Sequence, residues 1–516
     1  MTPIRRVAAL LVGSALVGGA RLASQAVERS DVPGSGVLRV TFDPRIMTWN
    51  SVFTDLGRLS LGRGLTGDSV GPAYIPAVAQ LQRDVRFASG VAGFVASLGQ
   101  GVLSVRQERR TYPVSAELGL SQRLSVRLMV PIVRVGVRTG LQLSPQGSTL
   151  GVNPKLTTAG AAAGYQAFFQ QFGAALAQLD SNIAHGVYPG CGGPCAPRDS
   201  SSYWHQVRDA LARSVNGVPF LPRDSSDGGK GITSTLTTIE SDMAKFSVAF
   251  SGALQLPSDT TRVGYAGMEL AVCPVCFLQP DSLGFGYHGF PFRNSFRYNL
   301  GDVQLGAKYR FAAGAHYAAA ALALLRLPTG ATDSADDWLR PSIGDHLWGF
   351  EGQVQQEVMV GPLWLNVALR GGTELAGHRV VRAAPWDALF VPAAATTPLR
   401  WQPGRYAGID VAPLVRLAPE FAAGFTAAYW TKARDHYSFA SPQDSVALAT
   451  RLGVPTPASI VNAGTSERAL RLGFALTYAG PRVEGGFSIE QTVTGAGVVP
   501  AATLFRIVMR VSRRLF

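Results

Sequence analysis

The segment GDVQLGAKYRF, Gly301 to Phe311, alternates strictly between apolar and polar positions. Alternation with a period of two predicts a β-strand that has one apolar and one charged face. One face carries Val303, Leu305, Ala307, Tyr309 and Phe311, and the other carries Asp302, Gln304, Lys308 and Arg310.

Similar runs recur along the chain, and each reaches the roughly 9–11 residues that a tilted strand needs to cross a bilayer. We count twelve of them, at 93–107, 111–120, 124–139, 300–311, 317–327, 346–360, 363–372, 405–417, 421–435, 468–479, 483–494 and 503–516. In the third run the apolar parity slips at VPIV, which predicts a β-bulge at Pro131.

The connections between these runs alternate between short and long. The short ones are SQR, AAGAH, GP, APE and GPR, and the long ones cover about 140–299, 328–345, 373–404 and 436–467. Outer-membrane barrels have short periplasmic turns and long extracellular loops. The pattern therefore predicts an all-β transmembrane antiparallel barrel of about twelve strands (10–14) in the bacterial outer membrane, with both chain ends on the periplasmic side.

Charge decides which face of each strand meets lipid. An arginine at the bilayer midplane costs about 2–4 kcal/mol, so the charged faces are expected to line the lumen. A soluble β-protein would turn its apolar faces inward, but the strand lengths and the aromatic residues near strand ends favour the membrane barrel. The candidate lumen-lining residues are Arg127, Asp302, Lys308, Arg310, Glu351, Glu357, Lys432, Arg434, Arg471, Glu484 and Glu490.

Composition agrees with this assignment. The chain is 47% hydrophobic, with a mean hydropathy of +0.14, yet it has no uninterrupted apolar stretch of the length that a spanning helix needs. The net charge of +13 comes from scattered arginines rather than from a basic run, which disfavours nucleic acid as a partner. Two arginines, an apolar run and small residues near Ala26 predict a secretory signal peptide at 1–26.

After the signal peptide, the chain is expected to have an N-terminal segment, the barrel and an insertion within the barrel. Residues 27–90 are expected to form an N-terminal periplasmic or plug-like segment, and residues 91–516 the barrel. Within it, residues 140–299 carry apolar side chains at helical spacing, which predicts a largely α-helical insertion in the first long extracellular loop. Its apolar faces either pack together as a simple cap or form a lid that presents apolar surface to a hydrophobic solute.

All four cysteines lie in this insertion, in a C-x3-C and a C-x2-C spacing. The spacing permits a zinc site, but an exported chain crosses an oxidising compartment, which favours disulfides. Three connectivities are open among Cys191, Cys195, Cys273 and Cys276.

The stretch NLGDVQLGAKYRF, followed by AALALLRLPTG and the acidic ATDSADDW, resembles the outer-membrane channel family named for the meta-pathway of phenol degradation. More loosely, it resembles the fatty-acid and aromatic-hydrocarbon transporters of the outer membrane. The resemblance implies a monomeric or trimeric barrel that admits small, often apolar or aromatic compounds. It carries over no catalytic or binding residue.

The sequence thus predicts a channel or transporter for uptake of small hydrophobic or aromatic solutes. The alternative is a non-transporting surface protein whose long loop is an adhesion or assembly contact. No catalytic motif, metal cluster or cofactor loop is present, so neither an enzyme nor a cofactor is expected. The expected partners are outer-membrane lipid, a small-molecule solute and the barrel-assembly machinery.

Overall fold

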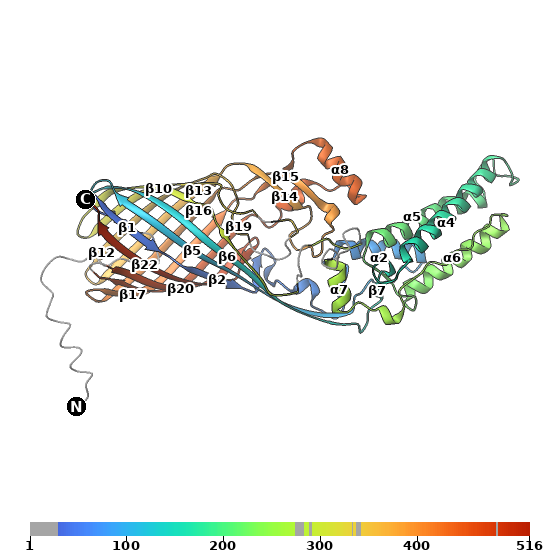
Figure 1. Cartoon of the computed structure of the whole chain (residues 1–516), viewed down its shortest axis with the longest axis horizontal. Coiled ribbons are helices and arrows are strands. Elements are labelled where there is room, and N and C mark those ends of the chain that lie inside the picture. The colour runs from blue at the N-terminus through green and yellow to red at the C-terminus, as the bar shows by residue number, and fades with distance from the viewer. Residues whose placement is uncertain (1–28, 274–282, 288–291, 333, 337–341, 481–482) are drawn as a thin grey trace, which may run out of the picture.

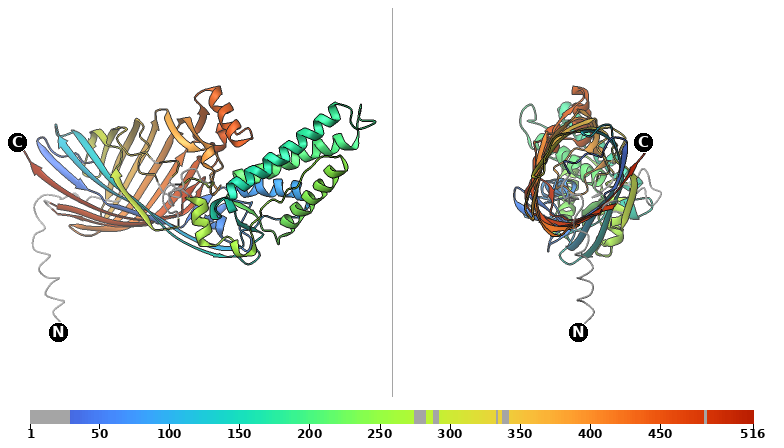
Figure 2. Two further views of the ribbon diagram at one scale, coloured as in Figure 1. Left: turned by 45° about the vertical axis from the view of Figure 1, so that its right-hand side comes forward. Right: turned by 90° about the vertical axis from the view of Figure 1, so that its left-hand side faces the viewer.

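The computed structural model describes residues 29–273, 283–287, 292–332, 334–336, 342–480 and 483–516. The signal peptide expected at 1–26 lies outside the described residues. The chain forms a barrel, from one end of which an elongated helical extension projects (Figures 1 and 2). Among the described residues, no helix is both long and apolar enough to span a membrane.

The barrel is a closed antiparallel sheet of twelve strands, two of which are each interrupted into two segments. The segments β1 and β2 form one strand, because both pair with β5 on one side and with β22 on the other. The segments β9 and β10 form another, because both pair with β6. The barrel segments are β1 (Val37–Phe42), β2 (Arg45–Trp49), β5 (Gln100–Gly119), β6 (Leu124–Ser144), β9 (Ser295–Leu300), β10 (Gln304–Ala313), β11 (Tyr317–Arg326), β12 (Gly349–Val360), β13 (Leu363–Glu374), β16 (Tyr406–Ala418), β17 (Phe421–Lys432), β19 (Glu467–Ala479), β20 (Val483–Ala496) and β22 (Thr503–Arg514).

The strand number agrees with the sequence prediction, but the first two strands were assigned wrongly. The runs at 93–107 and 111–120 belong to one long strand, β5, and the first strand comes from the segment at 27–90 that was expected to be plug-like. In the sequence, Asp43-Pro44 suggests a turn, and in the structure it interrupts the first strand between β1 and β2. Pro44 nevertheless removes only one backbone hydrogen-bond donor from the ladder. Its carbonyl still accepts a hydrogen bond from Ile507 N, so the strand continues past it.

Strand β6 itself has no bulge at Pro131, but its ladder to β9 and β10 shifts by one residue there, with the extra residue on the partner strand between Leu300 and Gln304. The ladder between β5 and β6 runs without a register shift from Gln100–Ser144 to Gly119–Ser125, and Pro131 pairs with Pro113 within it. The apparent change of parity arises because Val133 and Val135 face inward and are buried against Ile343. An apolar inward surface at this point mimics an outward face in the sequence.

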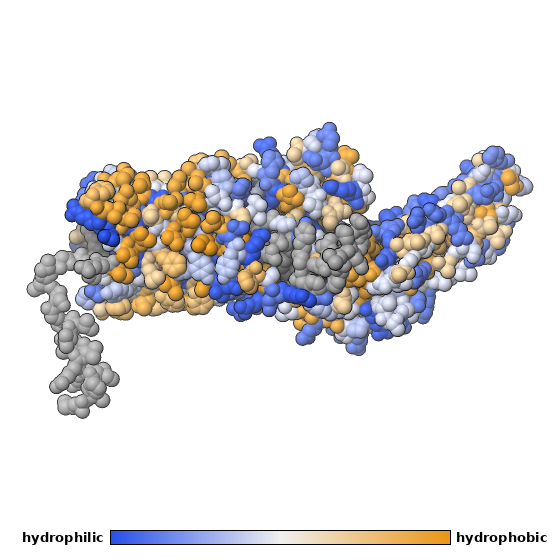
Figure 3. Space-filling view, in the orientation of Figure 1, coloured by the Kyte–Doolittle hydropathy of each residue, from blue (hydrophilic) through white to orange (hydrophobic). Residues whose placement is uncertain are grey.

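The tight turns all lie at one end of the barrel, which we call the turn end, and the long connections lie at the other, the loop end (Figure 1). Apolar side chains such as Leu305, Phe425 and Phe474 stand exposed on the outer wall. On the face seen in Figure 3, apolar side chains gather over the half of the barrel nearer the turn end. The outer wall therefore has the apolar surface of a membrane barrel.

The helical extension is built mainly from the connection between β6 and β9, as expected, and the segment before β5 contributes one further helix. Its helices are α2 (Pro76–Ser89), α3 (Pro154–Thr157), α4 (Ala161–Ala184), α5 (Ala196–Gly217), α6 (Asp227–Lys245) and α7 (Tyr265–Val272), with the short strands β7 (Leu150–Val152) and β8 (Phe220–Pro222). The predicted apolar faces are buried in one cluster, in which Phe172, Leu176 and Leu179 of α4 lie near Val207 of α5 and Ile239 of α6. Burial of these faces against one another favours a packed structural module over a lid that offers apolar surface.

Smaller elements cover the loop end. They are β3 (Ser51–Thr54), β4 (Gly57–Ser60) and β21 (Val499–Pro500) in one sheet, β14 (Gly377–Arg382), β15 (Thr396–Gln402) and β18 (His436–Phe439) in another, helix α8 (Pro442–Leu452), and the 3-10 turns η1 (Arg63–Leu65), η2 (Asp259–Thr261), η4 (Ala393–Ala395) and η5 (Ala458–Asn462).

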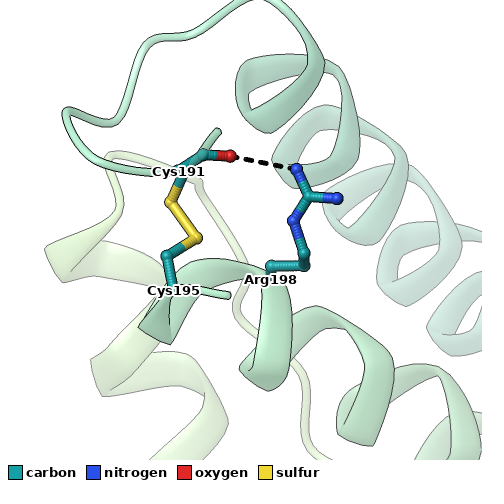
Figure 4. The surroundings of a disulfide bond; sticks show 3 residues. All are labelled: Cys191, Cys195 and Arg198. Atoms are coloured by element: carbon teal, nitrogen blue, oxygen red, sulfur yellow. Dashed lines mark hydrogen bonds between the residues drawn. A yellow bond between two sulfur atoms is a disulfide. The ribbon is translucent and has the colours of Figure 1, made fainter. Parts of the chain in front are cut away.

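A disulfide joins Cys191 to Cys195 at the connection between α4 and α5, where Arg198 donates a hydrogen bond of 3.0 Å to the Cys191 carbonyl (Figure 4). This confirms the disulfide interpretation over zinc for the first cysteine pair. Cys273 is also disulfide-bonded, and Cys276 lies outside the described residues.

Candidate functional site

The barrel encloses a cavity of about 380 Å³ near the middle of its length. Its lining includes seven arginines and only three carboxylates. The charged residues are Arg45, Arg109, Arg127, Arg326, Arg370, Arg471, Arg506, Glu351, Asp410 and Glu490. An excess of one charge sign inside low-dielectric walls focuses the electric field, so this cavity attracts anions.

Two of the three cavity carboxylates pair with arginines on neighbouring strands, whereas Glu351 accepts hydrogen bonds from Gln353 and Tyr406. An oxygen of Asp410 lies 3.2 Å from Arg370 Nη2, and an oxygen of Glu490 lies 3.7 Å from Arg471 Nε. Asp43, just below the cavity, lies 2.7 Å from Arg506 Nε. The acids thus hold individual guanidinium groups in place, while the lining as a whole keeps its positive charge.

A second cavity of about 630 Å³ lies toward the loop end, and we call it the vestibule. It shares Arg109, Arg326, Glu351 and Arg370 with the first cavity, so the two adjoin. Unlike the central cavity, the vestibule has equal numbers of acidic and basic residues in its lining. It also has four aromatic side chains, in which Tyr406 stacks on Trp430 at 4.8 Å between ring centroids and Trp401 stacks on Tyr437 at 6.0 Å.

The connection between β11 and β12 narrows the path from one side. Ile343 packs on Val133 and Val135 of β6, and its carbonyl accepts a hydrogen bond of 3.1 Å from Arg109. Asp302 fixes this connection by accepting a hydrogen bond of 2.7 Å from Gly330 N. The described residues of this connection around Gly330 and Ile343 are therefore part of the inner wall rather than of an external loop.

At the turn end, the chain's own residues 29–31 cross the lumen. Glu357 of β12 accepts hydrogen bonds of 2.7 and 2.9 Å from the backbone N–H and the hydroxyl of Ser30. Lys308 of β10 donates to the Arg29 carbonyl, and the Arg29 guanidinium lies 2.6 Å from Glu484 of β20. These three strands lie at separate places around the barrel, so the segment bridges opposite walls.

Only about 20 Å³ of space remains beside this segment. Ser30 is fully buried and Arg29 is 4% exposed. We call residues 29–31 the N-terminal closure, because they separate the arginine-lined cavity from the turn end.

The closure is held mainly by charge. Asp31 lies 2.9 Å from Arg29 Nε and 2.5 Å from Arg39 Nη2. Burial alone raises the pKa of Asp31, but the charges of Arg29 and Arg39 outweigh burial, so that the pKa lies well below its ordinary value. Asp31 therefore stays ionised at any physiological pH.

The predicted lumen residues fall into three groups. Arg127, Glu351, Arg471 and Glu490 line the central cavity, and Lys432 lines the vestibule with Glu351. Lys308, Glu357 and Glu484 hold the N-terminal closure. Asp302 is buried as a support of the inner connection, Arg310 lies on the inward parity of β10 near the turn end, and Arg434 is exposed beyond the end of β17, outside these cavities.

Sequence reasoning missed several members of the site. Arg45 and Asp43 lie in the strand that was assigned to the plug-like segment, and Arg109 lies between two runs that are one strand. Arg326 and Arg370 lie near the ends of the runs at 317–327 and 363–372 and are not among the predicted lumen residues. Extending the inward–outward alternation of each strand to its last residue would have placed these side chains in the lumen.

The strand pairing, the apolar outer wall and the charged interior thus define this protein as an antiparallel membrane β-barrel of twelve strands with a charged internal cavity. No family model matches the sequence, and no curated protein matches it either. The similar solved structures include an outer membrane channel from Pseudomonas putida F1, at 7% identity and a TM-score of 0.42, with 94% of this chain and 100% of that chain covered. They also include the Ralstonia pickettii toluene transporter TbuX (8% identity, TM-score 0.28, covering 94% of this chain and 90% of that chain). A Pseudomonas aeruginosa FadL homologue is similar as well (8% identity, TM-score 0.26, 93% and 90% covered). These neighbours include channels of the kind that the sequence resemblance indicated, while the fold assignment itself rests on the strand pairing of this chain.

Proposed function

We propose that this protein is a channel of the bacterial outer membrane that admits small anionic solutes, aromatic carboxylates in particular. The observation that carries the proposal is the adjoining vestibule and central cavity, of which the central cavity is lined by seven arginines and three carboxylates. In this arrangement the turn end faces the periplasm and the loop end faces outward, as in other barrels of this architecture.

The lining favours an anion over a neutral hydrocarbon. A neutral apolar solute would have to displace water from charged side chains without replacing their hydrogen bonds, which is unfavourable. A carboxylate instead matches the fork of donors on a guanidinium group. The stacked pairs Tyr406–Trp430 and Trp401–Tyr437 offer ring faces in the vestibule, so a solute with both a ring and a carboxylate finds a partner for each part.

The N-terminal closure makes the path conditional. The vestibule adjoins the central cavity on the loop-end side, but passage to the periplasm requires residues 29–31 to leave their position between β10, β12 and β20. We therefore propose a channel that is closed in the state described and that conducts when the closure is released.

Proteoliposome flux tests this proposal. Benzoate and the trimethylanilinium cation carry a similar ring and opposite charge, and we expect benzoate to enter faster by tenfold or more. Arg109→Gln combined with Arg127→Gln lowers the positive charge of the cavity and is expected to reduce benzoate flux selectively. Arg83→Gln with Arg451→Gln removes the same number of charges from exposed positions on α2 and α8; it is the matched control and leaves flux unchanged. Equal flux of both ions, or none through the protein with its closure removed, contradicts the proposal.

A second candidate is an adhesion or assembly contact, and the projection of the helical extension away from the barrel favours it (Figure 2). The chain offers a clean deletion, because Asn153 N donates a hydrogen bond of 2.9 Å to the Pro219 carbonyl beside the β7–β8 pair. Joining residues 153 and 219 removes α3, α4 and α5. Unchanged solute flux with loss of binding to cells or partner proteins favours this second function over a role of the extension in transport.

A further inference from the structure

An arginine cluster lies on the outside of the barrel, where the strand faces are otherwise apolar. On β6 the outward residues from Leu124 to Ile132 are apolar, and Arg134 and Arg138 follow on the same face. On β5 the paired outward residues are Arg106, Glu108 and Arg110. The inward residues of the same strands, such as Arg109, line the central cavity instead, so the two sets are distinct.

The height of this cluster places it at the outer edge of the membrane. A strand rises about 3.3 Å per residue and tilts by about 40° in such barrels. The path from Leu124 to Arg134 therefore covers about 25 Å of height, which equals the typical apolar band. Tyr309, paired with Leu124, and Tyr298, paired with Arg134, mark the two ends of this band as aromatic girdles do.

The cluster surrounds a hollow of about 440 Å³ on the barrel surface. Gly136 lies at its floor between Arg134 and Arg138, opposite Glu108 on β5 and Phe296 on β9. Arg106, Asn294 and Ser295 complete its lining. In Figure 3, hydrophilic side chains gather where β5 and β6 leave the apolar band.

Charge in the cluster is strongly unbalanced. Four guanidinium groups, from Arg106, Arg110, Arg134 and Arg138, stand on this face, and in the described part of the chain the hollow has one carboxylate in its lining, Glu108, which lies 2.8 Å from Arg110 Nε and 3.5 Å from Arg134 Nη1. The Arg134 guanidinium is also held 4.8 Å from the centre of the exposed Phe296 ring. A positive hollow directly above an apolar wall matches a lipid whose phosphate sits at the membrane surface and whose chains run down the wall.

We infer that this outer arginine cluster (Arg106, Arg110, Arg134 and Arg138) binds the phosphate of a glycolipid of the outer leaflet. The inference rests on the outer-membrane placement proposed above, but not on transport. The phosphate lies over Gly136 between Arg106 and Arg138, and the acyl chains lie along Ile132, Val130 and Leu128.

The test uses the full-length protein in detergent and measures lipid binding by native mass spectrometry. The probes are bis-phosphorylated lipid A, the same lipid without phosphates, and inorganic phosphate. Arg106→Gln with Arg138→Gln leaves the ion pairs of Glu108 in place and is expected to weaken binding of phosphorylated lipid A by about tenfold or more. Gly136→Leu keeps every arginine and fills the hollow, because a Cβ there meets only ordinary contacts at 3.5 Å and beyond, and it is expected to weaken binding too.

The control is Arg83→Gln with Arg451→Gln, which removes the same charge from exposed positions on α2 and α8 and leaves lipid binding unchanged. Equal binding of the phosphorylated and dephosphorylated lipid overturns the inference, as does displacement of lipid A by inorganic phosphate at equal concentration. A variant that changes the oligomeric mass without changing lipid retention would also overturn it, since the cluster would then be a subunit contact. Benzoate flux through the same variants is expected to stay normal, so that failure of the channel proposal is seen separately.

Discussion

The N-terminal closure should open when Asp31 loses its charge. In the substitution Asp31→Asn, the guanidinium groups of Arg29 and Arg39 lose the carboxylate that lies within 2.9 and 2.5 Å of them. Removing one partner of a buried ion pair costs about 3–5 kcal/mol, because the remaining charge stays desolvated. Arg29 keeps Glu484, and Arg39 keeps Glu117 at 3.5 Å, so the lower end of this range applies.

A loss of about 3 kcal/mol changes the ratio of open to closed channels by more than about 100-fold. Planar-bilayer recording measures this ratio as the open probability of single channels. Asp55→Asn, in the exposed turn between β3 and β4, is the matched control and should behave like the wild type. Heat-modifiable migration on gels shows whether each variant has folded as a barrel. An unchanged or lower open probability in folded Asp31→Asn protein would refute the idea that residues 29–31 close the lumen.

Three further predictions concern the closure, the core of the helical extension and its disulfide. The closure depends on pH through Asp31: since its pKa is lowered in the docked state, the stabilisation is complete above the ordinary value of 3.8 and is lost as the pH falls below it. Single-channel recording should therefore show the wild type equally closed at pH 8 and pH 5 and increasingly open below that ordinary value; opening between pH 8 and pH 5 would contradict this. Phe172→Ala in the core of the helical extension should destabilise that module by about 3–5 kcal/mol, seen as faster amide exchange in α4 and α5 while the barrel stays protected. Replacing both Cys191 and Cys195 by serine should increase proteolysis only at the connection between α4 and α5, since the bond closes a short loop; a loss of barrel folding would show that this view is wrong.

Alternation along the strands was enough to predict the barrel, because the side-chain period of two survives wherever one face meets lipid and the other meets water. Alternation was insufficient where the same face of a strand passes from one environment to another along its length. Val133 and Val135 are apolar and inward because a connection packs on them, and Arg134 and Arg138 are charged and outward because the strand has left the membrane. A periodic pattern reports polarity but not the medium that each face meets.

The closure was not predictable for a different reason. Arg29, Ser30 and Asp31 have no periodicity, and their role depends on Lys308, Glu357 and Glu484, which lie hundreds of positions away. Strand parity predicts that those three partners face inward, but sequence spacing does not show which charges meet across a lumen. The disulfide between Cys191 and Cys195 was easier, because four positions of separation allow the pair to meet locally.

The central claim is that an arginine-lined aqueous path runs through this barrel behind the closure. The most direct measurement is the reversal potential of the folded Asp31→Asn channel in a tenfold KCl gradient. A potential close to that of chloride is predicted, because the cavity has seven arginines against three carboxylates. A potential close to that of potassium, or no current through folded protein, would contradict the account.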